Sequence, residues 1–279
     1  MFFDSNPNEA LSNDLLDESR LKSAGLEVPS FEKDFSNGIK QSLPLLKKYI
    51  DKTDINKNIL EIGCSIGYFL SLLKNYGAIP HGLELNETRV EYVNEKLKID
   101  CYSDIEFYLK SKIKFKKIFL FYVIEYIPNI VSYLNSLKSI LDDEGEIIIT
   151  TPNLDDSLRK VWQNEFYESF FFEKLSVNYF TCHSLKNLFE KLDFSSYSIN
   201  TVQGYSFINH SNWFLNGKPH TSGIVGGDNF NKTLLSTLNK DVDENLQNLK
   251  QMISDFDKNY KLFMESLDYG NQIHFILQA

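Results

Sequence analysis

The sequence has few cysteines and no cluster of metal ligands. Only three of its 279 residues are cysteine, and no two of them form a C-x-x-C pair. Neither a disulfide framework nor a structural zinc site is therefore expected, and Cys64, Cys101 and Cys182 are predicted to be reduced residues in or near the core. The five histidines are scattered along the chain, so no metal site is predicted.

Dense positive charge and long apolar runs are also missing. The chain has 29 Lys and Arg against 38 Asp and Glu, and its net charge is −9. Because nucleic-acid affinity rests on clustered cations, a nucleic-acid partner is not expected and a small-molecule substrate fits better. No window reaches the roughly 18 apolar residues of a membrane helix, and residues 1–17 lack the apolar core of a signal peptide. We therefore predict a cytoplasmic protein without membrane contact.

Apolar strand-like runs alternate with helical stretches between residues 57 and 153, which is typical of βα units that build a mostly parallel sheet. The pattern predicts an α/β fold with a doubly wound, mostly parallel seven-stranded sheet and an antiparallel C-terminal strand. The predicted strands are 58–62, 79–85, 101–105, 117–124, 145–150, 197–202 and 271–279. The predicted helices between them include 87–97, 130–141 and 184–192.

The regular alternation stops after residue 203. Residues 204–227 are rich in Gly, Asn, His and Ser, which favours a functional loop. Apolar residues then recur at spacings of three or four over 235–267, which predicts a long amphipathic helix or helix pair. That helix packs on its own domain or forms a homodimer contact. The predicted organisation is an N-terminal helical segment 1–50, a core 51–203, an inserted cap 204–270 and a final core strand 271–279.

A glycine turn, Glu61-Ile62-Gly63-Cys64-Ser65-Ile66-Gly67, joins the first predicted strand to a helix. Glycines there let the backbone pass close to a ligand, and the helix N-terminus offers N–H groups to an anion. A dinucleotide fingerprint needs glycine where Ser65 and Tyr68 stand, so NAD is disfavoured. Glu84 closes the second strand, where an acid can accept hydrogen bonds from ribose hydroxyls. Together these features predict a nucleotide-class site.

The runs LEIGCSIGYFLSLL, GLEL, FYVIEYIPN and GEIIITTPN resemble class I S-adenosylmethionine-dependent methyltransferases over residues 58–153. The resemblance implies S-adenosylmethionine as cofactor and S-adenosylhomocysteine as product. It also implies a set of cofactor-binding residues: Glu61, Gly63 and Gly67 at the methionine end with Phe121 beside it, Glu84 at the ribose, Asp104 and Ile105 at the adenine, and in addition Cys64, Tyr68 and Leu85.

Two residues are candidates for work on the acceptor. Many small-molecule relatives carry Glu-His after the fourth strand, whereas this chain has Glu125-Tyr126. Because the ordinary pKa of tyrosine is near 10, a positioning role for Tyr126 is favoured over proton abstraction, with plain packing as the alternative. Residues 207–220 resemble the Asn-His…Trp…Gly-Lys-Pro loop of uncharacterised methyltransferases among surface-polysaccharide enzymes. We hypothesise that His210 is the base, because histidine titrates near pH 6.5, and that Asn209 and Trp213 shape the acceptor pocket. A structural role for His210 is the alternative.

The expected function is O-methylation of a sugar, a nucleotide-linked sugar or a related polar group in surface (capsular) polysaccharide biosynthesis. Alternative acceptors are a phosphate-derived, phosphoramidate-type capsule substituent, or a nitrogen or carbon atom of a small metabolite. A catalytically silent nucleotide-binding module is the alternative from another class. An NAD-dependent oxidoreductase is disfavoured by the missing glycines.

Overall fold

The computed structural model describes residues 31–172, 175–218 and 244–279. The described chain divides into two compact units. The first unit contains the described residues up to Thr150 together with Lys186–Ser198 and Phe275–Ala279. The second contains Thr151–Leu185 and Ile199–His274 as far as they are described.

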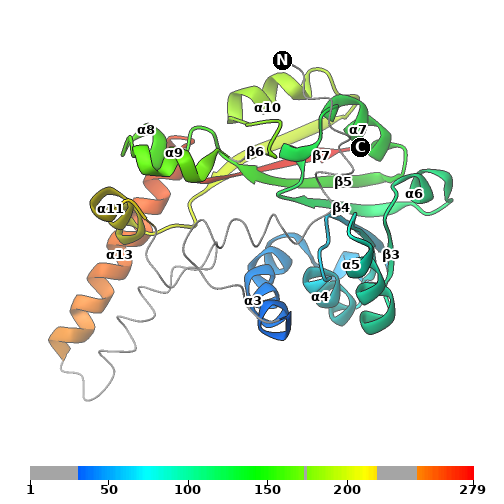
Figure 1. Cartoon of the computed structure of the whole chain (residues 1–279), viewed down its shortest axis with the longest axis horizontal. Coiled ribbons are helices and arrows are strands. Elements are labelled where there is room, and N and C mark those ends of the chain that lie inside the picture. Colours follow the sequence, from blue (N-terminus) through cyan, green and yellow to red (C-terminus); the bar gives the residue numbers. More distant parts are fainter. Residues whose placement is uncertain (1–30, 173–174, 219–243) are drawn as a thin grey trace. The chain divides into compact units, whose positions relative to one another are not determined.

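Seven strands form one sheet in the order β3-β2-β1-β4-β5-β7-β6 (Figure 1). The pairs β1–β2, β1–β4, β2–β3 and β4–β5 are all parallel. The strands are β1 (Asn58–Ile62), β2 (Ile79–Leu83), β3 (Asp100–Tyr102), β4 (Phe115–Phe121), β5 (Leu141–Pro152), β6 (Ser196–Val202) and β7 (Gln272–Gln278). This arrangement confirms the predicted doubly wound, mostly parallel sheet of seven strands.

The last two strands run antiparallel to their neighbours. Asn153 N–H donates to Asn271 O at 3.1 Å, and Ala279 N–H donates to Gly145 O at 3.0 Å, so β7 runs against β5. Ser195 N–H donates to Gln278 O at 3.0 Å, which begins the pairing of β6 against β7. The antiparallel C-terminal strand is therefore confirmed, and the predicted insertion does lie between β6 and β7.

Helices join the strands of the first unit, and the central strands are apolar because both faces of a parallel sheet are covered. The helices are α3 (Phe31–Tyr49), α4 (Tyr68–Tyr76), α5 (Glu87–Tyr92), η2 (Val93–Leu97), α6 (Glu106–Lys110), α7 (Ile130–Lys138) and the end of α10 (Cys182–Phe189). Asn side chains cap two of them: Asn86 accepts from Arg89 N–H, and Asn129 accepts from Ser132 N–H. Ile59, Phe69 and Phe119 lie in the core that these helices close.

The second unit contains α8 (Ser157–Lys160), α9 (Glu165–Phe171), α11 (Phe207–Asn216) and α13 (Glu244–Ser266). α13 confirms the predicted long helix over its described part, while residues 235–243 lie outside the described residues. Met252, Phe256 and Phe263 on α13 are more than half exposed. A homodimer contact through this helix stays a prediction, as does the predicted division of the chain at residues 50, 203 and 270.

Several predicted elements differ from the structure. β2 ends at Leu83 and not at residue 85, and β5 begins at Leu141, so the helix predicted at 130–141 ends at Lys138. The fourth strand ends at Phe121, because Tyr122 has a left-handed φ of +56° and the chain turns into the 3₁₀ helix η3 (Ile124–Tyr126). The predicted loop at 204–227 contains the helix α11, which Ser206 caps and Gly217 ends. Residues 219–227 of that predicted loop lie outside the described residues. The third strand covers only Asp100–Tyr102.

The cysteine prediction is confirmed, because Cys64, Cys101 and Cys182 are all buried and none of them forms a disulfide. No helix among the described residues is both long enough and apolar enough to cross a membrane.

Candidate functional site

The glycine turn leaves the carboxyl end of β1, where ligands bind in open α/β sheets. Gly63 has a φ of +74°, and a Cβ atom at this position would lie 2.5 Å from Cγ2 of Val123. Its N–H donates to Leu83 O at 2.7 Å, which ties the turn to the end of β2. Gly67, with a φ of +80°, ends the turn as the residue before α4. Only glycine combines this backbone with this close approach, so the two positions are required by the turn itself.

Ser65 shows how the turn tolerates a residue other than glycine. Its φ is +50°, a left-handed conformation that costs a residue with a side chain some energy. In return its N–H donates to Oε2 of Glu84 at 2.9 Å. This bond between the first and second strands' ends stabilises the left-handed conformation.

Glu84 is held at the end of β2 by two backbone donors. Besides the Ser65 bond, Oε1 accepts from Asn86 N–H at 3.0 Å. A carboxylate has about four acceptor sites, so two remain for further donors. The side chain is therefore fixed in place and still able to accept two hydroxyl hydrogens. Leu85, which follows it, is 44% exposed.

Glu61 is a buried acid at the end of β1, and only 5% of the residue is exposed. Its Oε2 has no hydrogen-bond partner among the described residues. Burial raises the pKa of the Glu61 carboxyl, the neighbouring Cys101 and Glu84 raise it further, and a hydrogen bond from the Leu70 backbone opposes the shift. A buried carboxylate is costly without a partner, so this orphan oxygen fits the positively charged group of a ligand.

Three further residues predicted to bind the cofactor, Cys64, Tyr68 and Phe121, differ in their environments. Cys64 is buried, with its Sγ 3.7 Å from Sγ of Cys101 and 3.9 Å from the Ser65 O of the turn. Tyr68 begins α4, and its ring lies 6.2 Å from the ring of Phe35. Phe121 is half-buried and packs edge-on against Phe69 at 5.1 Å.

Asp104 and Ile105 lie between β3 and α6, and Ile105 is the residue before the first residue of that helix. Asp104 is exposed, and its Oδ1 accepts from Glu106 N–H at 2.9 Å, which supports the start of that helix. Ile105 is half-buried. The structure leaves their contact with an adenine as a prediction.

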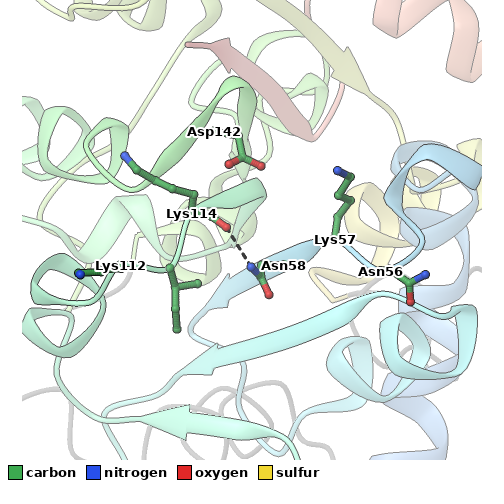
Figure 2. A pocket seen from close by; sticks show the side chains of 7 residues that line it. Asn56, Lys57, Asn58, Lys112, Lys114 and Asp142 are labelled. Carbon is green, nitrogen blue, oxygen red and sulfur yellow. Dashed lines mark hydrogen bonds between the residues drawn. The ribbon is translucent and has the colours of Figure 1, made fainter.

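A cavity of about 530 Å³ lies at the opposite ends of the strands. Figure 2 shows Asn58 at the start of β1, Lys112 and Lys114 before β4, and Asp142 at the start of β5. Asn58 Nδ2 donates to Lys114 O at 3.2 Å across it. Because ligands of such sheets bind at the carboxyl ends, this cavity is separate from the glycine turn.

Comparison with known proteins assigns the chain to a family. A methyltransferase-domain family matches residues 36–199, more than half of the 279-residue chain. The chain belongs to this methyltransferase family. A solved S-adenosylmethionine-dependent methyltransferase from Archaeoglobus fulgidus has the same fold, with 19% identity and a TM-score of 0.54 over 89% of this chain and 98% of that chain.

Two curated relatives are similar in sequence. An uncharacterised protein of Methanocaldococcus jannaschii is 28% identical over 142 residues, which are 51% of this chain and 60% of the relative. The ubiquinone biosynthesis O-methyltransferase of Glaesserella parasuis serovar 5 is 30% identical over 131 residues, with 39% of this chain and 52% of that protein covered. The chain thus spans less than two thirds of the length of either relative.

The family confirms the predicted methyltransferase class, and the fold is that of solved S-adenosylmethionine-dependent methyltransferases. The residues present fit this cofactor. Its methionine end carries an ammonium group, from which the orphan oxygen of Glu61 can accept a hydrogen bond. Its ribose hydroxyls can donate to a carboxylate such as that of Glu84. The site residues themselves, and the surface-polysaccharide branch, stay predictions.

Tyr126 of the methyltransferase is the last residue of η3 and is half-buried. Its N–H donates to Val123 O at 3.0 Å, and Val123 also packs against the Gly63 position. The turn that carries Tyr126 is therefore built directly on the glycine turn. A positioning role at the acceptor remains a prediction.

His210 lies on α11 in the second unit and is completely buried. Its Nδ1 is 2.5 Å from Oη of Tyr260, and its Nε2 is 3.3 Å from Nε2 of Gln203. Oε1 of Gln203 accepts from Asn271 N–H, so the amide nitrogen faces His210 and must be the donor. The imidazole proton therefore lies on Nδ1 and is donated to Tyr260, which also accepts from Trp162 Nε1 at 2.8 Å.

Two premises of the His210 hypothesis are corrected by this environment. The residue is on a buried helix face and not in an open loop. Burial lowers the pKa of His210 to about 3, with the charge of Lys261 as a smaller cause, so the ordinary value does not apply. Both ring nitrogens are engaged, which favours a structural role, and the assignment as base stays an untested hypothesis.

Asn209 and Trp213 share the helix with His210 and are also buried. The Asn209 Oδ1 has no partner among the described residues. Trp213 packs with Leu158, Tyr167 and Phe171 in the apolar core of the second unit. Their predicted part in an acceptor pocket therefore stays a prediction, and the observed part of Trp213 is packing.

Sequence reasoning missed several residues of the second unit that the structure connects. Asp156 is fully buried, caps α8 through Leu158 N–H and accepts from Tyr167 Oη at 2.9 Å. Burial raises its pKa to about 6, and these hydrogen bonds oppose the shift. An Asp just before a helical run is the sequence signal that predicts such a cap.

Proposed function

We propose that this chain transfers the methyl group of S-adenosylmethionine to a small polar acceptor. The observation that carries the proposal is the buried Oε2 of Glu61, which has no partner in the described part of the chain, beside the left-handed glycine turn at the carboxyl end of β1. A cationic or donating ligand group would offset the cost of burying such an oxygen. Family membership and the fixed carboxylate of Glu84 support the same cofactor.

Each group of the site has a part in holding the cofactor. Glu61 would bind the methionine ammonium, Glu84 would accept from the ribose hydroxyls, and the first-turn N–H groups of α4 would favour the methionine carboxylate. Gly63 and Gly67 leave room for the backbone to approach. When bound, the cofactor supplies a methyl group on a positively charged sulfur, which needs no metal to make it reactive.

For the acceptor we propose an oxygen atom of a sugar, a nucleotide-linked sugar or a related polar group in surface-polysaccharide assembly. The loop resemblance at residues 207–220 supports this class, and a relative named as an O-methyltransferase supports oxygen as the methylated atom. In this reaction the acceptor oxygen bonds to the methyl carbon, the carbon–sulfur bond breaks, and the hydroxyl proton leaves to a base or to water. Tyr126 is the residue we propose to orient the acceptor.

Calorimetric titration tests the cofactor first. Wild-type protein should bind S-adenosylmethionine and S-adenosylhomocysteine with micromolar affinity and should not bind NAD. Glu84→Gln should weaken this binding at least about tenfold, since it removes a charged acceptor, whereas Glu87→Gln, an exposed acid three residues away, should have no effect. Equal affinity in Glu84→Gln and Glu87→Gln would remove the ribose assignment.

Turnover tests the acceptor. Transfer of a labelled methyl group to a panel of sugars, sugar nucleotides, phosphoramidates and amines, followed by mass and NMR analysis of the product, identifies the methylated atom. Methylation of nitrogen, carbon or a phosphate-derived group would replace the sugar proposal. Cofactor binding without consumption across the whole panel would favour a silent binding module.

A further inference from the structure

A second cavity, of about 490 Å³, lies within the second unit just after β5. Its lining residues are Leu154 and Asp155 before α8, residues of α8 and α9, and Phe172 and Tyr179 beyond α9. Figure 1 shows α8 and α9 next to each other. Four charged and three apolar or aromatic side chains line it: Asp155, Arg159, Lys160, Glu168, Leu154, Phe172 and Tyr179. None of these residues takes part in the cofactor site.

Arg159 is the least exposed charge of the cavity, because its side chain is 17% exposed against 31% to 49% for the other three. Its guanidinium lies over two aromatic rings, with Cζ 5.1 Å from the Phe171 centroid and 4.9 Å from the Phe172 centroid. Nε donates to Oε1 of Glu168 at 2.9 Å, and Nη1 donates to Leu154 O. The planar group is therefore held in one orientation.

The two short helices that carry Arg159 and Glu168 are themselves fixed. Asp156 caps α8, Asn164 caps α9 by accepting from Tyr167 N–H, and the Asp156 carboxylate accepts from Tyr167 Oη. These bonds tie α8 to α9 beneath the cavity. A site whose walls are positioned before binding loses less entropy when a ligand enters.

Arg159, the most buried of the four charged side chains, keeps unused hydrogen-bond donors, while the unused acceptors of Asp155 and Glu168 lie on more exposed side chains. The guanidinium has five N–H groups, and within the described residues its contacts use those on Nε and Nη1 while Nη2 has none. Lys160 has three donors, and its Nζ forms an ion pair with Oδ1 of Asp155 at 2.8 Å. Because Arg159 is the deepest charge, an acceptor-rich anionic group fits better than an ammonium group.

The aromatic part of the cavity suits a ring. Phe172 and Tyr179 meet at a centroid distance of 4.9 Å and an angle of 68°, and Phe172 is 45% exposed. An exposed aromatic face packs against the flat face of an aromatic ring or a sugar. A ring and an anion on one small molecule would use both halves of the cavity.

We propose that this cavity binds a cyclic ligand carrying a carboxylate or phosphate, with the anion on Arg159 and the ring on Phe172 and Tyr179. The further step that this ligand is the methyl acceptor rests on the proposed function. The site would then select anionic rings over neutral ones of the same size.

The test compares matched probes by saturation-transfer NMR in the presence of S-adenosylhomocysteine. Benzoate and phenyl phosphate are the anionic aromatic probes, benzamide is the neutral one, and glucose 6-phosphate with glucose distinguishes a sugar ring from an aromatic one. In each pair of probes that binds, wild-type protein should bind the anionic member about tenfold or more tightly than the neutral member. Arg159→Gln should abolish that preference, and Phe172→Leu should weaken both members of a pair.

The control variant is Lys258→Gln, which removes an exposed cation from α13 of the same unit and should leave the preference unchanged. If Arg159→Gln does not fold, Lys160→Gln removes a more exposed cation of the same cavity and should reduce the preference several-fold. Equal binding of charged and neutral probes, or a preference that persists in these cavity variants, would overturn the proposal. Failure of S-adenosylhomocysteine to bind while the preference for anions persists would refute only the proposed function.

Discussion

Acidification should destabilise the second unit through His210. The folded imidazole, buried between Tyr260 and Gln203, has a pKa of about 3, whereas an unfolded histidine has a pKa near 6.5. Between these values the unfolded chain binds a proton that the folded chain does not bind. The free energy of unfolding therefore falls as the pH falls from 6.5 towards 3.

The size of the effect follows from the two pKa values. Between pH 7 and pH 5 the difference in proton binding at His210 lowers the free energy of unfolding by about 2 kcal/mol. His210→Gln removes the titrating group and retains a hydrogen-bonding side chain. We therefore expect the wild type to lose about 2 kcal/mol more than this variant over that pH range.

The chain contains two tryptophans, Trp162 and Trp213, and both lie in the second unit. Urea unfolding followed by tryptophan fluorescence at pH 7 and pH 5 therefore reports on this unit. Comparison with the variant is needed because Asp156, whose pKa is raised to about 6, has the opposite effect. Protonation of Asp156 on acidification stabilises the folded state. If wild type and His210→Gln lose the same stability on acidification, His210 is not a buried neutral imidazole.

Three further substitutions test the first unit. Gly63→Ala should abolish cofactor binding in calorimetry and lower the thermal midpoint, because φ is +74° and the new Cβ would lie 2.5 Å from Val123 Cγ2; full binding would contradict the geometry of the turn. Glu61→Gln should maintain or raise stability, because it removes a buried carboxylate with a raised pKa, while cofactor affinity falls about tenfold or more. Lys117→Met should cost about 3–5 kcal/mol in urea unfolding, because it leaves the buried carboxylate of Asp54 without the ion pair that now lies at 2.8 Å. Adding Asp54→Leu should recover most of that loss, and a fully stable single variant would refute the pair.

The glycine turn at the carboxyl end of β1 could be predicted because its signals are local in the chain. Gly63 and Gly67 are required by the backbone of one turn, and β1, which precedes them, is observed with the predicted bounds. Glu84 lies at the end of the next strand, and parallel neighbours bring their carboxyl ends to one edge. The bond from Ser65 N–H to Glu84 joins two residues that the sequence had already singled out.

The second unit could not be predicted in the same way because its contacts join distant segments. A polar, histidine-containing stretch has the composition of a loop, yet Ser206 and Gly217 supply the caps of a helix there. His210 meets Tyr260, fifty residues later along the chain, and Gln203 meets Asn271. No local pattern reports such pairs, so neither the burial of His210 nor the value of its pKa follows from composition.

The sequence by itself determined the alternation of strands and helices, the strand-to-helix glycine turn and the acid at the end of the next strand, because each depends on neighbouring residues or on a short period. Tertiary structure decided which polar groups are buried and what they contact. Within the described residues it left Oε2 of Glu61 without a partner, engaged both nitrogens of His210, and held Arg159 between Glu168 and two aromatic rings. Burial and hydrogen-bond geometry arise only when separate elements pack together, and they set the chemistry of each of these groups.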